Sequence, residues 1–227
     1  MTALLASVAN LEEARLAAQA GVDLIDLKNP QQGALGALAL DEITRIVQAL
    51  PNHQISATIG DQPLQPESIV EAVKTTGATG VDFIKIGFFP GGDMDGTLRM
   101  LKPLAQDLAL IAVLFADYLI ALPLIEALAK SGFTGVMLDT ARKKQGPLTK
   151  LRPLPFLQHF IDKAREQALL TGLAGSLRFE DISALLALEP DYLGFRGALC
   201  DQQQRGNPLN YQKLQQIRDA IPRENNP

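Results

Sequence analysis

Short apolar segments alternate with amphipathic segments along the whole chain. The apolar segments are five to eight residues long, and they contain many β-branched residues. Such runs are typical of strands that are buried on both faces. We predict strands over 3–8, 22–28, 54–59, 81–87, 108–115, 135–139, 169–174 and 192–196.

The segments between these strands have helical periodicity. We predict helices over 11–20, 41–50, 66–76, 97–106, 120–130, 155–167, 180–188 and 211–220. Asn10 is placed to cap the first helix, with Glu12 and Glu13 in its first turn, and Asp41 is the predicted cap of the second. The caps and the periodicity agree on where these helices begin.

The strict alternation of strands and helices predicts the fold. Eight units in 227 residues leave about 28 residues for each, and Gly21-Val22-Asp23 and Gly80-Val81-Asp82 open two of the strands as a weak repeat. Eight units with buried parallel strands are typical of a closed (β/α)8 TIM barrel, an α/β fold. An open doubly wound sheet is the alternative, but the sequence lacks the glycine-rich phosphate turn that such sheets usually carry. We predict one catalytic barrel domain over 1–222 and a frayed tail over 223–227.

Composition narrows the range of functions. The net charge of −4 and a pI of about 5.2 argue against a nucleic-acid surface. A single cysteine, Cys200, and two distant histidines, His53 and His159, argue against a disulfide framework and a metal site. We find no signal-peptide pattern and no run of 18 apolar residues. We therefore expect a soluble cytoplasmic protein without a membrane partner, and we give Cys200 a packing role.

Charged residues stand at the carboxyl ends of alternate predicted strands. They are Asp26, Lys28, Lys85, Asp139, Lys143 and Arg196. The odd-numbered strands mostly lack such charges, apart from Asp117 after the fifth. Alternate strands contribute to one layer of a barrel, and catalytic groups of this fold lie at the carboxyl ends of its strands. The pattern therefore predicts one catalytic site.

Lysines and aspartates in one layer favour amine chemistry. A desolvated lysine near another cation is neutral more often, and a neutral amine can form a Schiff base with an aldehyde or ketone. Simpler interpretations stay open. Lys28 could be a solvated strand-end residue, and Lys85 half of a structural ion pair. Asp26 and Asp139 could be helix caps or structural partners, and Arg196 could neutralise a carboxylate.

An anion site is predicted beside this layer. Gly175 and Ser176 follow the seventh strand, and Gly197 and Ala198 follow the eighth, where this fold usually binds phosphate. Arg196 and the run 142–144 are candidates for a second phosphate. These glycines could instead be ordinary turns. The long segment 29–40 after Lys28 is either a surface excursion or a lid or wall of the site.

Five motifs resemble those of the (5-formylfuran-3-yl)methyl phosphate synthase family, also called 4-(hydroxymethyl)-2-furancarboxaldehyde-phosphate synthases. The resemblance extends from the first strand to the last helix. The motifs are Asp26-Leu27-Lys28-Asn29-Pro30 with Gly33 and Leu35-Gly36, Gly80-Val81-Asp82-Phe83-Ile84-Lys85-Ile86-Gly87, Asp139-Thr140-Ala141 with Lys143, Leu173-Ala174-Gly175-Ser176, and Gly194-Phe195-Arg196-Gly197-Ala198-Leu199-Cys200 with Arg205-Gly206.

The resemblance implies a TIM-barrel lyase, without metal or organic cofactor, of methanofuran-type cofactor biosynthesis. Such an enzyme condenses two molecules of glyceraldehyde 3-phosphate into a furan aldehyde phosphate with loss of phosphate and water. Lys28 matches the Schiff-base lysine of the family and Lys85 its proton acceptor, while Asp26, Asp139 and Lys143 match pocket residues. The chain departs from the third motif at Lys144-Gln145, which bears on the shape of that loop.

Two other functions fit the same residues less well. One is another Schiff-base aldolase or epimerase acting on small phosphosugars, and the other is a phosphate-ligand sensor without turnover. The sensor leaves the buried Lys85 without a role. We expect a triose phosphate as the small-molecule partner, no nucleic-acid partner, and allow for a homo-oligomer.

Overall fold

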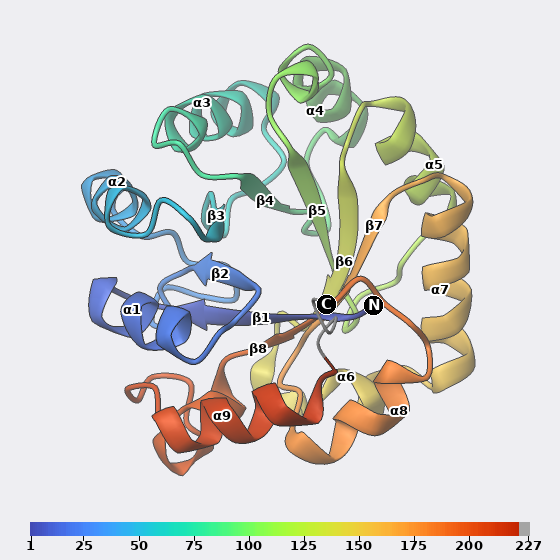
Figure 1. Cartoon of the computed structure of the whole chain (residues 1–227). Coiled ribbons are helices and arrows are strands. Elements are labelled where there is room, and N and C mark those ends of the chain that lie inside the picture. Colours follow the sequence, from blue (N-terminus) through green and yellow to red (C-terminus); the bar gives the residue numbers. More distant parts are fainter. Residues whose placement is uncertain (223–227) are drawn as a thin grey trace.

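Eight parallel strands close into a barrel in the computed structural model, which describes residues 1–222 apart from the side chain of Lys144 (Figure 1). Each strand pairs with its neighbours in the sequence, and β1 closes the barrel by pairing with β8. The predicted (β/α)8 barrel is confirmed. The strands are β1 (Ala3–Val8), β2 (Leu24–Leu27), β3 (Gln54–Thr58), β4 (Phe83–Gly87), β5 (Leu110–Phe115), β6 (Gly135–Asp139), β7 (Leu170–Leu173) and β8 (Tyr192–Phe195).

The helices surround the barrel in chain order and cover the outer face of the sheet (Figure 1). Among residues 1–222, none of them has the length and hydropathy to cross a membrane. The predicted tail 223–227 lies outside the described residues. The helices are α1 (Leu11–Gln19), α2 (Leu40–Ala49), α3 (Pro66–Gly77), α4 (Met94–Leu101), α5 (Pro123–Lys130), α6 (Leu148–Leu151), α7 (Leu154–Glu166), α8 (Ile182–Leu186) and α9 (Tyr211–Ala220).

The structure confirms one predicted helix cap and corrects the predicted boundaries of two helices. Asn10 caps α1 as predicted, because its Oδ1 accepts the Glu13 N–H at 2.9 Å. The prediction of Asp41 as the cap of α2 was wrong, since α2 begins at Leu40 after Ala39, and Asp41 lies in its first turn. The helix predicted over 97–106 is also wrong in extent, because Pro103 cannot continue an α-helix and the chain resumes as a 3-10 turn (η1, Leu104–Gln106).

The alternation along each strand separates two apolar clusters. On β5, Leu110, Ala112 and Leu114 belong to the outer cluster between strands and helices, whereas Ile111 and Val113 belong to the cluster inside the barrel. The inner cluster extends along the barrel interior and reaches the carboxyl ends of the strands. Its members are Leu5, Leu24, Ala34, Leu35, Ile111, Val113, Phe115, Met137, Ala174 and Tyr192.

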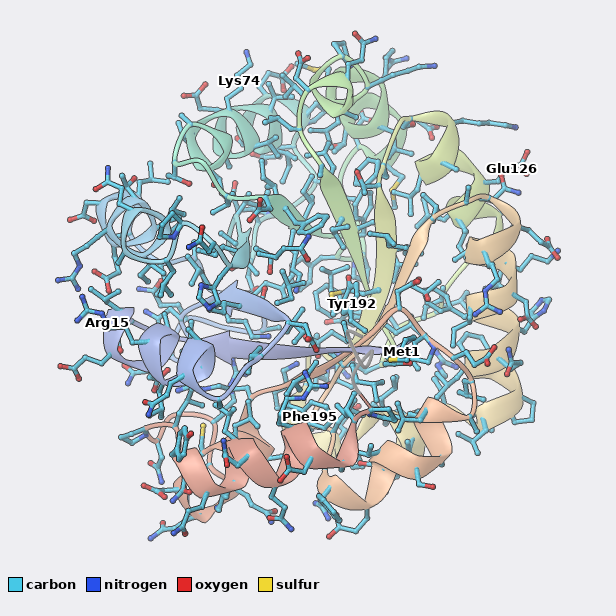
Figure 2. All side chains as sticks on the ribbon, viewed as in Figure 1. Met1, Arg15, Lys74, Glu126, Tyr192 and Phe195 are labelled. Carbon is cyan, nitrogen blue, oxygen red and sulfur yellow. The ribbon has the colours of Figure 1, made fainter. Side chains whose placement is uncertain are left out.

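One large ring occupies the barrel axis near its amino-terminal end. Tyr192 begins β8, is buried, and lies at the centre of the barrel (Figure 2). A Cβ at Gly172 of β7 would come within 2.3 Å of the Tyr192 ring, so only glycine leaves room for it. The ring helps to fill the lower barrel, and charged side chains occupy the layer above it.

Candidate active site

The side chains of Lys28 and Lys85 meet that of Asp26 at the carboxyl end of the barrel. Asp26 ends one inward-facing series on β2, and Lys28 continues that face one residue beyond the strand. The Lys85 Nζ lies 2.8 Å from Asp26 Oδ1, and the Lys28 Nζ lies 3.8 Å from Asp26 Oδ2. The structure therefore brings together residues that the sequence separates by up to 59 positions, from Asp26 to Lys85.

Asp139 completes the cluster from the opposite side. Its Oδ1 lies 2.5 Å from the Lys143 Nζ and accepts the Thr140 N–H at 2.7 Å. Its Oδ2 lies 3.8 Å from the Lys28 Nζ. All five predicted catalytic residues are thus in one connected cluster.

Lys28 differs from the other two lysines in its contacts. Lys85 and Lys143 each form a short ion pair with one aspartate, at 2.8 and 2.5 Å. The Lys28 Nζ lies at 3.8 Å from both carboxylates, and among the described residues it makes no hydrogen bond. Its side chain is only 9% exposed. Lys28 is therefore a buried amine held near two negative charges but bonded tightly to neither.

The two carboxylates stay ionised despite their burial. Burial alone raises the pKa of Asp26, but the Lys85 and Lys28 ammonium groups and hydrogen bonds bring it down to about 2. The hydroxyls of Ser7 and Ser56 donate to it at 2.9 and 2.7 Å. Burial likewise raises the pKa of Asp139, and Lys143 and Lys28 lower it below its ordinary value. Both aspartates are therefore anions near neutral pH.

The paired lysines have weakened ammonium forms. Burial lowers the pKa of Lys85, opposed by Asp26 and reinforced by the charge of Lys28. Burial also lowers the pKa of Lys143, opposed by Asp139 and reinforced by Lys28. Three amines share two carboxylates. With all three amines protonated and both carboxylates ionised, the cluster would carry one uncompensated positive charge. This excess favours one neutral amine in the cluster.

A cavity of about 540 Å³ opens above the cluster. Leu5 and Met137 form part of its apolar lining, and the lysines and aspartates lie at its base. The loops that follow β2, β6, β7 and β8 supply its walls. A cavity of this size is typical of sites for small organic ligands.

The predicted phosphate loops line this cavity with unused donors. Among the described residues, the backbone N–H groups of Gly175, Ser176, Gly197 and Ala198 have no hydrogen-bond acceptor. Gly175 has a φ of +108°, and a Cβ there would lie 2.8 Å from Thr140 Cγ2, so this turn requires glycine. The four N–H groups are available to an anion at the end of the barrel where this fold usually binds phosphate.

Arg196 is occupied by protein acceptors. Its guanidinium pairs with Glu13 of α1 at 2.5 Å and donates to the carbonyls of Ser7, Arg205 and Asn207 at 2.9 to 3.1 Å. The structure thus agrees with the alternative that Arg196 neutralises a carboxylate. Its five N–H donors are all used, so its side chain offers none to a phosphate.

The other candidates for binding a second phosphate, in the run 142–144, differ in where their side chains lie. The Arg142 guanidinium lies over the Tyr118 ring, 5.4 Å from its centroid, and does not line the cavity. Lys143 lines the cavity but is paired with Asp139. The side chain of Lys144 lies outside the described part of the structure.

The segment 29–40 forms one wall of the cavity, which decides between its two predicted interpretations. Leu35 is buried and lines the cavity. The carboxylate of Asp61 accepts the N–H groups of Ala34 and Leu35 at 2.7 and 2.6 Å, and thereby ties this segment to the loop after β3. The segment is a wall of the site rather than a surface excursion.

The residues outside the cluster behave more simply. Cys200 is buried, and burial raises its pKa to about 11, which fits the predicted packing role. His53 precedes β3 and His159 lies exposed on α7, both away from the cavity. Within residues 1–222 no three His, Cys, Asp or Glu side chains gather as a metal site would require.

Sequence reasoning missed Ser7, Ser56 and the role of Arg205. Ser7 and Ser56 lie directly opposite Asp26 in the parallel register of β1, β2 and β3. Ser7, a polar residue in the otherwise apolar β1, could have been found in this way, whereas Ser56 alternates with Gln54 and Thr58 in β3 and does not stand out. Arg205 lines the cavity from the loop after β8; it belongs to the fifth motif, but nothing in that motif indicated its place in the cavity.

Comparison with known proteins gives a consistent result over the whole barrel. A family model described as 4-HFC-P synthase matches residues 4–218. A Methylorubrum extorquens protein provisionally named (5-formylfuran-3-yl)methyl phosphate synthase is 40% identical over 96% of this chain and 91% of its own. The (5-formylfuran-3-yl)methyl phosphate synthase of Methanocaldococcus jannaschii is 34% identical over 90% of this chain and 92% of its own.

Solved structures share the fold at low identity. Phosphoribosyl anthranilate isomerase from Thermus thermophilus superposes with a TM-score of 0.69 at 16% identity, covering 97% of this chain and 98% of its own. A 3-hexulose-6-phosphate synthase superposes with a TM-score of 0.67 at 19% identity, covering 97% of this chain and all of its own. At these identities the similarity is one of fold.

Proposed function

The chain belongs to the 4-HFC-P synthase family, and on this premise we propose that it condenses two molecules of glyceraldehyde 3-phosphate. The product is (5-formylfuran-3-yl)methyl phosphate, formed with loss of phosphate and water, and it serves methanofuran-type cofactor biosynthesis in the cytoplasm. Because a phosphate is eliminated, the enzyme is a carbon–oxygen lyase acting on phosphates. The reaction proceeds through a Schiff base on a lysine.

The contacts of Lys28 carry this proposal. A Schiff-base lysine must present a nitrogen lone pair to a carbonyl carbon. Lys85 and Lys143 hold their nitrogens in short ion pairs, whereas the Lys28 Nζ is 3.8 Å from either aspartate at the base of the cavity. The iminium that Lys28 forms keeps a positive charge between the same two carboxylates. Asp26 and Asp139 therefore stabilise the covalent intermediate without moving.

Lys85 is the base of the next step. Once the iminium has formed, a proton on the adjacent carbon becomes acidic, and its removal gives an enamine. The lowered pKa of Lys85, caused by burial, makes its neutral form accessible, and Asp26 orients its nitrogen at 2.8 Å. The proton moves from carbon to the Lys85 Nζ.

The second aldehyde reacts at the opposite side of the cluster. The enamine carbon attacks its carbonyl, and the alkoxide that develops needs a proton. Lys143, paired with Asp139 and with a pKa lowered by burial, lines the cavity and can donate that proton. The backbone N–H groups of the β7 and β8 loops bind a phosphate group of the substrate.

Borohydride trapping tests the covalent step. The protein is incubated with glyceraldehyde 3-phosphate and borohydride, and the modified peptide is mapped by mass spectrometry. We expect the adduct on Lys28, no adduct on that peptide in Lys28→Met, and an unchanged adduct in Lys74→Met. Lys74 is an exposed lysine on the outer side of α3 (Figure 2). An adduct on another lysine, or none, contradicts the assignment.

Product identification separates the proposal from its alternative. Another Schiff-base aldolase or epimerase for phosphosugars would give the same Lys28 adduct. With glyceraldehyde 3-phosphate as the only substrate, the proposed lyase releases one inorganic phosphate for each furan aldehyde formed. A linear or epimerised sugar phosphate without phosphate release would favour the alternative.

A further inference from the structure

The loop after β8 places a second arginine, Arg205, over the mouth of the cavity. This loop closes on itself, because Cys200 and Leu209 form an antiparallel bridge and the Asp201 N–H donates to the Pro208 carbonyl at 3.2 Å. Arg205 lies within the closed segment and lines the cavity. Its side chain is half-buried, so part of it stays accessible to a ligand.

Arg205 has donors to spare. Its Nη2 donates to the Gly33 carbonyl at 2.7 Å, and this is the only hydrogen bond of its side chain among the described residues. No described carboxylate lies within 4.0 Å of it, unlike Arg196, whose charge is matched by Glu13. A guanidinium has five N–H donors in a planar fork, which suits the oxygens of a phosphate group.

Arg196 holds the backbone that carries Arg205. The Arg196 Nε donates to the Arg205 carbonyl at 2.9 Å, and its Nη2 donates to the Asn207 carbonyl at 3.1 Å. Glu13 fixes the guanidinium of Arg196 from α1, at 2.5 Å. Arg196 is thus a positioning residue, and the cation that it positions toward the cavity is Arg205.

The charges around Arg205 favour an incoming anion. Burial lowers its pKa, the charge of Arg196 acts in the same direction, and Asp139 and Asp61 only partly oppose this. A guanidinium that is partly desolvated without a direct carboxylate partner is stabilised by a phosphate dianion.

We propose that Arg205 binds a substrate phosphate group at the mouth of the cavity. The phosphate accepts hydrogen bonds from the unused guanidinium donors of Arg205 and contacts the loop after β8. The hydrogen bond from Arg205 to the Gly33 carbonyl connects this site to the wall formed by 29–40. The anion class stands on the geometry alone, and its assignment to a triose phosphate rests on the proposed function. No bond is made or broken in this binding step.

Phosphate binding by the full chain tests the site without turnover. Inorganic phosphate is titrated calorimetrically into the wild type, Arg205→Gln, Arg205→Lys and Arg15→Gln. Arg15 is an exposed arginine on the outer side of α1 and supplies the matched loss of charge (Figure 2). Because a charge-assisted bidentate contact is lost, we expect affinity to fall about tenfold or more in Arg205→Gln. The phosphate affinity of Arg205→Lys should lie between those of the wild type and Arg205→Gln. The affinity of Arg15→Gln should equal that of the wild type.

Equal phosphate affinity in Arg205→Gln and the wild type overturns the proposal. Chemical protection gives a second measurement on the unaltered chain. Phosphate should protect Arg205, but not Arg15, from modification by phenylglyoxal, as mapped by mass spectrometry. Equal modification of Arg205 with and without phosphate also overturns it.

Trapping at Lys28 distinguishes phosphate binding from an effect on the reactive lysine. Arg205→Gln should trap unphosphorylated glyceraldehyde as the wild type does, but require a higher concentration of glyceraldehyde 3-phosphate for half-maximal trapping. Equal weakening with both aldehydes would place Arg205 in the positioning of Lys28 and overturn its role as phosphate ligand. If the wild type binds phosphate through Arg205 yet makes no furan product, the proposed function fails and the anion site stands.

Discussion

The two ends of the barrel use aspartate for opposite purposes. At the amino-terminal end, Asp23, Asp82 and Asp191 each stand one residue before an even-numbered strand and are exposed. Each accepts a backbone N–H from the strand before, those of Leu4, Ile55 and Thr171, at 2.6 to 2.7 Å, and Asp23 in addition forms an ion pair with the buried Arg218 of α9. At the carboxyl end, Asp26 and Asp139 are buried and hold lysines.

The burial of a carboxylate and the group that it binds decide whether it contributes to stability or fixes a charge state. An exposed carboxylate on a neutral backbone N–H joins two strands, and its contribution is to stability. A buried carboxylate between ammonium groups contributes little net stability because desolvation opposes the attraction, but it fixes the charge state of an amine. The amino-terminal end of this barrel thus contributes to stability, and the carboxyl end holds the lysine that we propose forms the Schiff base.

The largest effect is expected at the carboxyl end, where the double substitution Asp26→Asn, Lys85→Met should lower activity without lowering stability. The double change removes one positive and one negative charge together, so the net charge of the cluster stays the same. Loss of the proposed base should lower kcat about 10²–10⁴-fold. The melting temperature should not fall, since replacing a buried ion pair by uncharged groups is often neutral or stabilising.

Steady-state kinetics and thermal melting check this prediction on the same preparations. Lys74→Met, which removes an exposed charge on α3, serves as the control and should match the wild type in both. Retained activity together with a melting temperature lowered by several degrees would make the Asp26–Lys85 pair structural.

Acid unfolding should sharpen the same contrast. The pKa of Asp26 falls from 3.8 to about 2 on folding, because Lys85 and Lys28 outweigh the burial that raises it. A carboxyl with a lowered pKa stabilises the fold above its unfolded pKa, and this stabilisation is lost as the pH falls through the folded value. About 2 kcal/mol is expected to disappear between pH 4 and pH 2 from this residue.

Urea unfolding across that pH range measures the loss. The free energy of unfolding should fall less steeply with acid in the Asp26→Asn, Lys85→Met double variant than in the wild type. Lys74→Met should keep the wild-type slope. Parallel slopes in all three proteins would show that Asp26 has no lowered pKa in the fold.

The contrast between the ends also explains what the sequence could reveal. Barrel topology follows from strand and helix periodicity, and Lys85 stood out because a charge within an apolar run has no solvated place. The repeat Gly21-Val22-Asp23 and Gly80-Val81-Asp82 was visible, and its meaning is the carboxylate that ties each strand to the one before. These features are local, and local patterns record them.

Long-range pairing decided the rest. Arg196 was a natural phosphate candidate until Glu13, 183 positions away, was seen to occupy its guanidinium. Arg205 gained its place from a loop that closes through other residues, and Lys28 acquires two carboxylates only when β2 and β6 lie across the same barrel. The break at Pro103, in contrast, was readable from the sequence, because proline interrupts a helix.

A smaller effect, on stability alone, is expected from Asp82→Ala at the amino-terminal end. The Ile55 N–H loses its acceptor, and the tie between β3 and the start of β4 goes with it. The cost should be about 1 kcal/mol, which lowers the melting temperature of a chain of this size by about 2–4 °C. Asp95→Ala, which removes an exposed aspartate from the first turn of α4, is not expected to cost as much.

Activity separates this change from those at the carboxyl end. The kcat of Asp82→Ala, measured well below its melting temperature, should stay within about twofold of the wild type, because a surface tie lies outside the catalytic layer. A large loss of kcat with unchanged stability would mean that the amino-terminal end also controls the reactive lysines.

The smallest effect is expected where the two ends meet, at Tyr192. Its hydroxyl is buried, and among the described residues it has no hydrogen-bond partner. Burial, Asp26 and Asp191 all raise its pKa, so the phenol stays neutral. Because a buried hydroxyl without a partner opposes folding, Tyr192→Phe should raise the free energy of unfolding by up to about 1 kcal/mol and leave kcat unchanged. A lower melting temperature would instead show that water in the adjoining cavity of about 140 Å³ binds this hydroxyl, and that polar groups continue below Lys85.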